Sequence, residues 1–147
     1  MRVSTKGRYG LRVLLDIALH RESGAVALSD IARRQAISQK YLWQVINPLK
    51  AAGFLNATRG SRGGYALARL PKDISIRDIV SVLEGPVCMV ACVKDPESCD
   101  RSVSCVAREA WIEIESKLND AMQEITLNDL VQRHKDHESR VAQTYVI

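Results

Sequence analysis

The sequence contains no long apolar run. None of its uninterrupted apolar stretches approaches the roughly 18 residues that a membrane-spanning helix requires. The N-terminal residues Met1 to Lys6 also lack the apolar core of a signal peptide. We therefore expect a cytoplasmic protein. With 46% hydrophobic and 26% charged residues over 147 positions, the composition is that of a folded chain with a buried core, which excludes disorder for most of it.

The common catalytic signatures are missing as well. The sequence has no C-x-x-C redox pair, no glycine-rich phosphate loop after a predicted strand and no Ser/His/Asp arrangement. His20 lies in the first predicted helix and is interpreted as a core or surface residue. We therefore expect a protein that is not an enzyme. A thiol oxidoreductase built on the cysteines is the competing enzyme class.

Acidic residues are scarce in one half of the chain. Residues 1–72 contain 13 Lys or Arg and three Asp or Glu, a net charge of +10, whereas residues 73–147 contain 8 basic and 14 acidic residues, a net charge of −6. A basic surface can bind an acidic protein or lipid headgroups, but +10 in 72 residues is the electrostatic footprint of a nucleic-acid-binding module. The first half is therefore the predicted nucleic-acid-binding region.

Apolar residues recur at helical spacing in three parts of this region. We expect helices at Tyr9–Arg21, at 28–35 and, after a tight turn, at Gln39–Ala52, with Ser38 as the N-cap of the third. Two short helices joined by a turn are typical of a helix-turn-helix, whose second helix places its N-terminal residues in the major groove of DNA. An ordinary amphipathic helix with a solvated face is the alternative. The candidate DNA-contacting residues on the third helix are Ser38, Lys40, Tyr41, Trp43 and Gln44.

A glycine-rich hairpin is predicted next. Leu55–Arg59 and Tyr65–Ala68 have the composition of short strands, and the sequence Gly-Ser-Arg-Gly-Gly separates them. Three helices followed by a hairpin are the order of a winged helix, in which an arginine on the wing can enter a narrow minor groove. Arg59 and Arg62 are the candidates. The predicted fold is mainly α, a winged helix-turn-helix with a small β-hairpin wing and a long C-terminal dimerisation helix.

The acidic half carries capping signals and one long apolar seam. Ser75–Asp78 predicts a helix from Ile76 to about Leu83, and Thr126–Asp129 predicts a short final helix to about Lys135. Between them a helix over 105–125 carries apolar residues at alternating spacings of four and three, a pattern typical of a coiled-coil seam. The seam can pack within its own chain, but we favour a homodimer that binds two half-sites. Its residues are Ala107, Trp111, Ile114, Leu118, Ala121 and Ile125.

The expected organisation has four parts. These are the DNA-binding region at 1–72, a connecting helix with a cysteine-rich loop at 73–104, the dimerisation helix and short final helix at 105–135, and a tail at 136–147.

All four cysteines lie within 18 residues, in the pattern Cys88-x3-Cys92-x6-Cys99-x5-Cys105. The residues between them are polar and turn-forming, so the clustering favours metal ligation or redox chemistry over packing. The paired C-x2-C knuckles of a structural zinc site are absent, although a zinc-structured repressor stays open. Iron–sulfur clusters also take thiolate ligands and accept irregular loops, and one iron can have a ligand other than cysteine.

Several motifs in order resemble the IscR-like iron–sulfur regulators of the Rrf2 family. They are Ser4-Thr5-Lys6-Gly7-Arg8-Tyr9-Gly10, Ile37-Ser38-Gln39-Lys40-Tyr41-Leu42, Arg59-Gly60-Ser61-Arg62-Gly63-Gly64-Tyr65 and the cysteine loop followed by Trp111. The resemblance extends from the N-terminus to about Leu130. It implies a homodimeric winged-helix transcription regulator that carries a 2Fe-2S cluster on Cys92, Cys99 and Cys105 and controls cluster-assembly genes. It also implies that Gln44 and its neighbours read the major groove while Arg59 reaches the minor groove.

Two positions depart from the family pattern. Arg108 stands where the family's iron–sulfur regulator has a histidine ligand, and an always-charged guanidinium cannot ligate iron. The fourth ligand is therefore open between Cys88, Glu109, Asp95 and a carboxylate of a partner subunit. Trp43 stands where relatives often have Glu, which leaves the preferred DNA sequence open. A cluster-free regulator of the same family, which senses oxidants or a metabolite through its thiols, is the main alternative.

Overall fold

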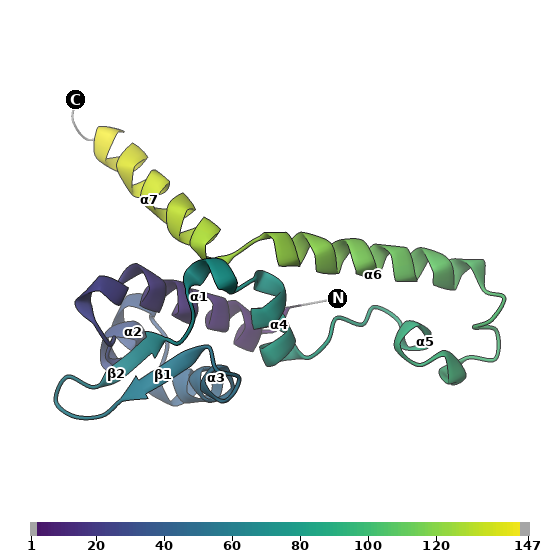
Figure 1. Ribbon diagram of the computed structural model, residues 1–147, viewed down its shortest axis with the longest axis horizontal. Coiled ribbons are helices and arrows are strands. Elements are labelled where there is room, and N and C mark those ends of the chain that lie inside the picture. Colours follow the sequence, from purple (N-terminus) through teal and green to yellow (C-terminus); the bar gives the residue numbers. More distant parts are fainter. Residues whose placement is uncertain (1–2, 145–147) are drawn as a thin grey trace.

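Residues 3–144 are described in the computed structural model, which consists of a head and a projecting arm (Figure 1). The regular elements are α1 (Thr5–Leu19), α2 (Leu28–Gln35), α3 (Gln39–Ala51), β1 (Leu55–Thr58), β2 (Gly64–Leu67), α4 (Ile76–Glu84), α5 (Ala91–Lys94), α6 (Val106–Glu124) and α7 (Leu127–Thr144). The head contains α1 to α4, the hairpin and the start of α7. The arm, residues 88–124, contains α5 and α6.

The head is a winged helix, as predicted. The apolar faces of α1 to α4 meet in one core together with the first turns of α7, where Leu127 and Val131 are buried. Strands β1 and β2 pair antiparallel, with Leu55 opposite Leu67. Val26 adds a bridge on the other side of Tyr65 through two backbone hydrogen bonds of 2.8 Å, which fixes the wing to the segment before α2. The two predicted strands are confirmed to within a residue at each end.

The predicted start of the first helix, Tyr9, is wrong. Helix α1 begins at Thr5 because the Ser4 hydroxyl caps it, accepting hydrogen bonds from the backbone N–H groups of Lys6 and Gly7. Two glycines in the first turns, Gly7 and Gly10, lie where α4 packs closely against α1. The helix also ends at Leu19 rather than Arg21, and Arg21–Ser23 forms a separate 3-10 turn.

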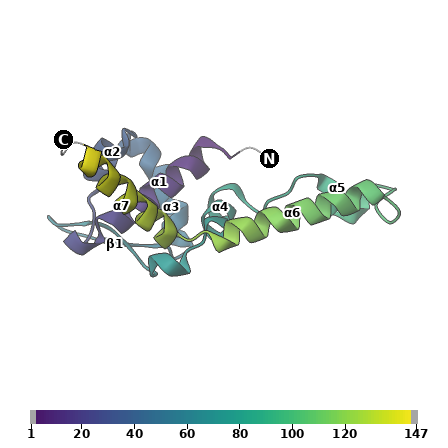
Figure 2. The same ribbon diagram turned by 90° about the horizontal axis from the view of Figure 1, so that it is seen from above.

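The arm leaves the head after α4 and returns through α6 (Figures 1 and 2). Gly85 ends α4 with a φ of +87°, a conformation that favours glycine. At the far end α5 packs against α6, which then runs back to the head. Hydrogen bonds from Ile76 N–H to the Ile125 carbonyl, 2.9 Å, and from Leu127 N–H to the Ile74 carbonyl, 2.8 Å, fix the junction of α6 and α7 to the head.

Two expectations for the acidic half are corrected. The final helix continues to Thr144 instead of ending near Lys135, so most of the predicted tail is helical, and residues 145–147 lie outside the described part. An i,i+4 pair between His134 and Glu138, 3.3 Å apart, supports this exposed stretch, where apolar periodicity has lapsed. The loop between the cysteines also contains more local structure than expected, namely α5 and a 3-10 turn at Pro96–Ser98.

The capping signals of the acidic half are confirmed. The Ser75 hydroxyl accepts from the Asp78 N–H while the Asp78 carboxylate accepts from the Ser75 N–H. Thr126 and Asp129 make the same reciprocal pair at the start of α7, and these hydrogen bonds hold the pKa of Asp129 below its ordinary value. Within residues 3–144 no helix is long and apolar enough to cross a membrane.

Candidate DNA-binding surface and cysteine segment

Helix α3 presents the predicted recognition residues on its outer face. The Ser38 hydroxyl caps the helix by accepting a hydrogen bond from the Tyr41 N–H at 3.2 Å. Lys40 and Gln44 are exposed in its first two turns. The opposite face of α3 is fully buried in the head, so the polar face must point outward. The buried residues are Leu42, Val45, Ile46 and Leu49.

The two aromatic candidates on α3 also contact the rest of the head. The Tyr41 ring meets the Tyr9 ring of α1 edge to face, with centroids 5.5 Å apart. Trp43 makes an edge contact with Tyr65 of β2 at 6.3 Å and is still 46% exposed. These contacts set the positions of α1 and the wing relative to the recognition helix. Burial raises the pKa of Tyr65 above its ordinary value.

The wing places its two arginines at an exposed tip. Arg59 follows β1 directly and Arg62 lies in the turn, which a hydrogen bond from Gly63 N–H to the Gly60 carbonyl closes at 3.0 Å. Gly60 has a φ of +109°, which favours glycine there. A groove of about 400 Å³ lies between α3 and the wing, with Trp43 and Arg59 among its lining residues. The geometry fits a helix that enters the major groove with a wing beside it.

Helix α1 adds cations that the sequence analysis did not identify as candidates. The exposed guanidinium groups of Arg8 and Arg12 lie 5.7 and 5.2 Å from the centroid of the Tyr9 ring. Because Tyr9 contacts Tyr41, these charges lie beside the N-terminal end of α3. The available signal for Arg8 was the basic motif at 4–10, but a linear motif does not show which helix its arginine will neighbour.

A buried carboxylate joins α1 to the helix-turn-helix. Asp16 is only 2% exposed and accepts hydrogen bonds from Arg34, at 2.6 and 3.0 Å, and from Gln35 at 2.8 Å. Burial alone would raise the pKa of Asp16, but the hydrogen bonds from Arg34 and Gln35 outweigh it and hold this pKa below its ordinary value. Arg12 also donates to the Gln35 carbonyl at 2.6 Å. The end of α2, directly before the turn to α3, is thereby fixed to α1.

The cysteine segment, residues 88–105, carries four free thiols. Cys92 lies in α5, Cys99 follows the 3-10 turn and Cys105 directly precedes α6, and all three are half-buried, whereas Cys88 is exposed. Among residues 3–144, no three Cys, His, Asp or Glu side chains come together in an arrangement that could hold a metal ion. The structure thus places the three predicted ligands on one short segment without gathering their sulfur atoms.

Two hydrogen bonds tie this segment to α6. Glu115 accepts from the Met89 N–H at 3.2 Å, and Arg108 donates from Nε to the Cys92 carbonyl at 2.8 Å. Arg108, which stands at the family's histidine position, therefore holds α5 against the first turn of α6. Cys88 interacts only locally here, through a 3.4 Å contact from its sulfur to the Val90 carbonyl.

Helix α6 exposes the predicted dimer seam. None of its residues is buried, and Trp111 and Ile114 are 39% and 44% exposed. Leu118 is half-buried, while Ala107 and Ala121 are exposed and Ile125, just past the end of α6, is half-buried. A monomer that leaves an indole and an isoleucine on one open helix face has apolar surface for a partner. The homodimer itself stays a prediction.

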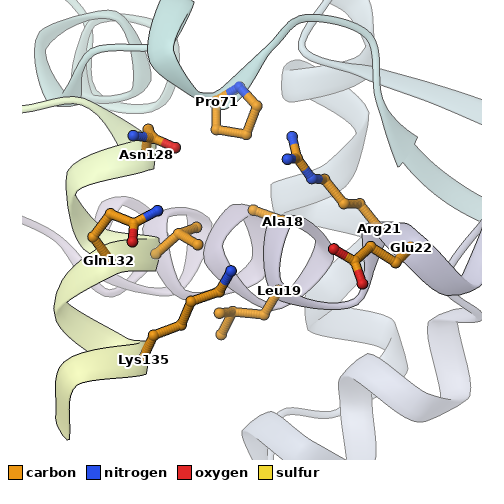
Figure 3. Close-up of a pocket in the computed structure, with 9 residues that line it drawn as sticks. Ala18, Leu19, Arg21, Glu22, Pro71, Asn128, Gln132 and Lys135 are labelled. Atoms are coloured by element: carbon orange, nitrogen blue, oxygen red, sulfur yellow. The ribbon is translucent and has the colours of Figure 1, made fainter.

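A small cavity lies where α1, the 3-10 turn at Pro71–Asp73 and α7 meet (Figure 3). Its volume of about 50 Å³ has room for water but not for a metabolite. Figure 3 shows Lys135 and Gln132 of α7 across from Ala18 and Leu19 of α1. This junction therefore fixes α7 to the head and is not a ligand site.

The comparisons with known proteins agree with this geometry. The model of the Rrf2 family, described as iron-dependent transcriptional regulators, matches residues 3–133. Protein rrf2 of Nitratidesulfovibrio vulgaris is 40% identical over 131 residues, covering 89% of this chain and 87% of that protein. The regulator CymR of Bacillus subtilis is 36% identical over 146 residues, covering 99% of this chain and 100% of that protein. The regulator IscR of Pectobacterium atrosepticum is 35% identical over 131 residues, with 89% and 79% covered.

Solved structures give the same result. The structure of CymR, the global cysteine regulator of B. subtilis, superposes with a TM-score of 0.77 at 35% identity, covering 90% of this chain and 98% of that chain. That of T. potens IscR has a TM-score of 0.76 at 35% identity, covering 93% and 90%. IscR and CymR are therefore similar to this chain to the same degree. The chain belongs to the Rrf2 family and is a DNA-binding transcription regulator.

Proposed function

We propose that this regulator is a homodimer whose cysteine segment senses iron–sulfur status, or oxidative or nitrosative conditions, through a 2Fe-2S cluster. The observation that carries the proposal is the position of Cys92, Cys99 and Cys105, three half-buried free thiols on one short segment that leads directly into α6. The iron-dependent description of the family and the similarity to IscR support it. On this basis the target genes include those for cluster assembly. The chain is a regulator and not an enzyme.

The donor set fits such a cluster in its chemistry. Thiolates are the usual ligands of iron–sulfur clusters, and these three are in no disulfide. Residues 88–105, all of which the structure describes, include no buried apolar side chain. Bringing the three sulfur atoms together would therefore disrupt little packing. When bound, a 2Fe-2S cluster supplies one-electron redox chemistry.

The fourth ligand must be a residue other than Arg108. Its guanidinium is a donor without acceptor capacity, and it already bonds to the Cys92 carbonyl. Cys88, four residues before Cys92, offers the same chemistry as the other three. Asp95, within the segment, and Glu109, in the first turn of α6, offer carboxylates.

The chain's own residues explain how the cysteines could influence DNA binding. Cys105 is the N-cap residue of α6 and gives it no side-chain cap, so a constraint on this side chain orders the first turn of the helix. Helix α6 carries the dimer seam, so its first turns set the distance between two heads. A tenfold difference in operator affinity between two states requires about 1.4 kcal/mol of differential stabilisation.

Anaerobic reconstitution with iron and sulfide tests the cluster. We expect visible absorbance with iron and acid-labile sulfide at two of each per protomer. Single Cys→Ser variants at 92, 99 and 105 should lose the chromophore. Cys88→Ser is the matched variant: loss of the chromophore there identifies the fourth ligand, and its retention points to a carboxylate. A chromophore that survives all three ligand substitutions would disprove the assignment.

Operator binding tests the regulatory step separately. Footprinting on genomic DNA with reconstituted and cluster-free protein at matched salt reports the target sites and the effect of the cluster together. We expect at least one class of sites to differ in occupancy. Equal binding of both forms at every site would refute cluster-dependent regulation and leave DNA binding intact.

A cluster-free thiol regulator is the second candidate. It is favoured by the separation of the three sulfurs in this structure and by the similarity to CymR, which is described as a global cysteine regulator. DNA binding that changes with thiol oxidation in iron-free protein would select it. Stoichiometric zinc without sulfide would instead indicate a zinc-structured repressor, and disulfide reductase turnover would indicate a thiol oxidoreductase.

A further inference from the structure

The last residue of α4 closes the first turn of α1. The Glu84 carboxylate accepts hydrogen bonds from the Gly7 N–H at 2.9 Å, from the Ser4 N–H at 3.2 Å and from the Ser4 hydroxyl at 2.5 Å. These backbone donors lie at a helix N-terminus and have no backbone acceptor within the helix, and a negative charge there is favourable. The two residues are 77 and 80 positions from Glu84 in the sequence.

The two glycines of α1 make this contact possible. A Cβ atom on Gly7 would lie 2.4 Å from the Glu84 Oε1 atom, and one on Gly10 would lie 2.0 Å from a Leu83 methyl group. Both distances are too short for any side chain. The spacing of three places the glycines on one face of α1, where they accept the end of α4. The Lys6-Gly7-Arg8-Tyr9-Gly10 motif thus has a structural role in addition to its charge.

Glu84 lies between the two functional parts of the molecule. On one side, Gly85 ends α4 and only Pro86 and the buried Val87 separate it from Cys88. On the other side, the first turns of α1 carry Tyr9, whose ring contacts Tyr41 at the start of the recognition helix. Figure 1 shows this end of α1 beside α4, where the arm leaves the head.

We propose that Glu84 is a positioning residue that transmits the state of the cysteine segment to the DNA-binding surface. A movement of the cysteine segment displaces the end of α4. Through its hydrogen bonds, the Glu84 carboxylate then displaces the first turn of α1, which carries Arg8 and Tyr9. From there the Tyr9 contact reaches the N-terminal end of α3. This inference rests on the proposed function only in its claim that the cysteine state alters DNA binding.

Hydrogen exchange tests the link without DNA. The peptide covering residues 3–12 is compared before and after alkylation of the thiols with iodoacetamide. In the wild type we expect its exchange to change on alkylation. In Glu84→Ala we expect exchange that is faster throughout and the same before and after alkylation. Glu84→Gln retains an acceptor and covers the case in which the alanine variant folds poorly. Glu113→Ala, an exposed carboxylate on α6, is the matched control and should behave as wild type.

Operator affinity provides the second measurement. Where the wild type shows an affinity ratio of about tenfold between reconstituted and cluster-free protein, Glu84→Ala should bring that ratio close to one. A purely structural role would weaken both forms equally and leave the ratio unchanged. A wild-type ratio of one would contradict the proposed function, whereas the exchange experiment would still test the link.

A double-mutant cycle locates the coupling in the contact itself. Gly7→Ala should perturb α1 as Glu84→Ala does, because the added methyl group displaces the carboxylate. In the Glu84→Ala background the same substitution should be neutral or stabilising, since alanine favours helix. Additive effects of the two substitutions, or identical alkylation responses in wild type and Glu84→Ala, would overturn the proposal.

Discussion

The head and the arm differ in how their conformations are determined. The head contains the buried hydrophobic core of the described chain, whereas residues 88–124 have no buried apolar side chain. The head is therefore fixed by its own packing. The arm instead carries an apolar seam, which a second protomer is proposed to cover, and four free thiols. In a regulator this division is useful, because a rigid surface reads DNA and a weakly held one responds to a signal.

The largest effect should follow from a substitution that creates a cavity in the core of the head. Leu42, fully buried on α3, contacts the core, so Leu42→Ala should lower the free energy of unfolding by about 3 kcal/mol. Ile114→Ala on the arm should cost less than about 0.5 kcal/mol in the monomer, because its side chain is already half exposed. Denaturant titration followed by circular dichroism at low protein concentration measures both. Equal losses would show that the arm is packed as the head is.

The next largest effect is expected in the apolar seam of α6, where a second protomer is predicted to bind. Trp111→Glu places a charge in the seam of α6 and should weaken dimerisation by about a hundredfold or more, which corresponds to about 2.7 kcal/mol. Sedimentation equilibrium over a concentration series measures the dissociation constant. Val141→Glu, an exposed apolar position on α7, is the control. A wild-type chain that stays monomeric at high concentration would contradict the predicted interface.

A third prediction concerns the charge buried in the head. Asp16→Asn should destabilise the head by about 2 kcal/mol, because Arg34 then loses its charged partner in a largely buried site. The pKa of Asp16 is lowered in the folded state, so its contribution is fully present above the unfolded value of about 3.9 and is lost as the pH falls through the folded pKa. The difference between the unfolding free energies of the two proteins should therefore be constant from pH 7 to about pH 4 and should narrow steadily as the pH falls further. A difference that stays constant through the acidic range would show that ionisation of Asp16 is irrelevant.

The sequence predicted elements whose signals are local. The Ser38 cap, the reciprocal pair at Ser75 and Asp78 and the glycine-rich wing each occupy a few consecutive residues, and each is confirmed. The start of α1 was missed although its N-cap, Ser4, is a local signal, because no apolar periodicity marks the first turn and Gly7 is held there by Glu84, 77 residues away. The end of α7 was missed because its second half is exposed and polar, with an i,i+4 pair between His134 and Glu138 but no apolar periodicity.

The candidate site was likewise predictable only where it depends on local signals. The residues of α3 and the wing could be chosen because helix-turn-helix geometry follows from helix order, and in the structure Trp43 and Arg59 line one groove between α3 and the wing. The pairing of Asp16 with Arg34 and the neighbourhood of Arg8 and Tyr41 depend on tertiary contacts that no spacing encodes. The sulfur positions depend on a segment with little packing of its own.

Substitutions in the head should change operator affinity, whereas a substitution in the arm should not. Gln44→Ala and Arg59→Ala should each weaken operator binding by about tenfold, or about 1.4 kcal/mol, with Gln44 altering the preferred bases. Fluorescence anisotropy with operator and unrelated DNA over a salt series separates the two effects, since a phosphate contact weakens both DNAs and lowers the salt slope. Lys94→Ala, an exposed cation of the arm, should leave both affinities unchanged. An equal loss for Lys94→Ala would move part of the DNA-binding surface onto the arm.

The smallest effect is expected at an exposed ion pair on α6. Lys117 and Glu113 form an exposed i,i+4 ion pair, and such pairs contribute about 0.3 to 0.5 kcal/mol to a helix. Lys117→Ala should therefore change the unfolding free energy by no more than this, and the change should vanish in high salt, because exposed charges are screened. A larger loss that persists in salt would mean that the Lys117 side chain stabilises α6 through packing, because salt would have screened its charge. The arm would then be held by its own packing as the head is, and the contrast between a self-determined head and a partner-determined arm would no longer hold.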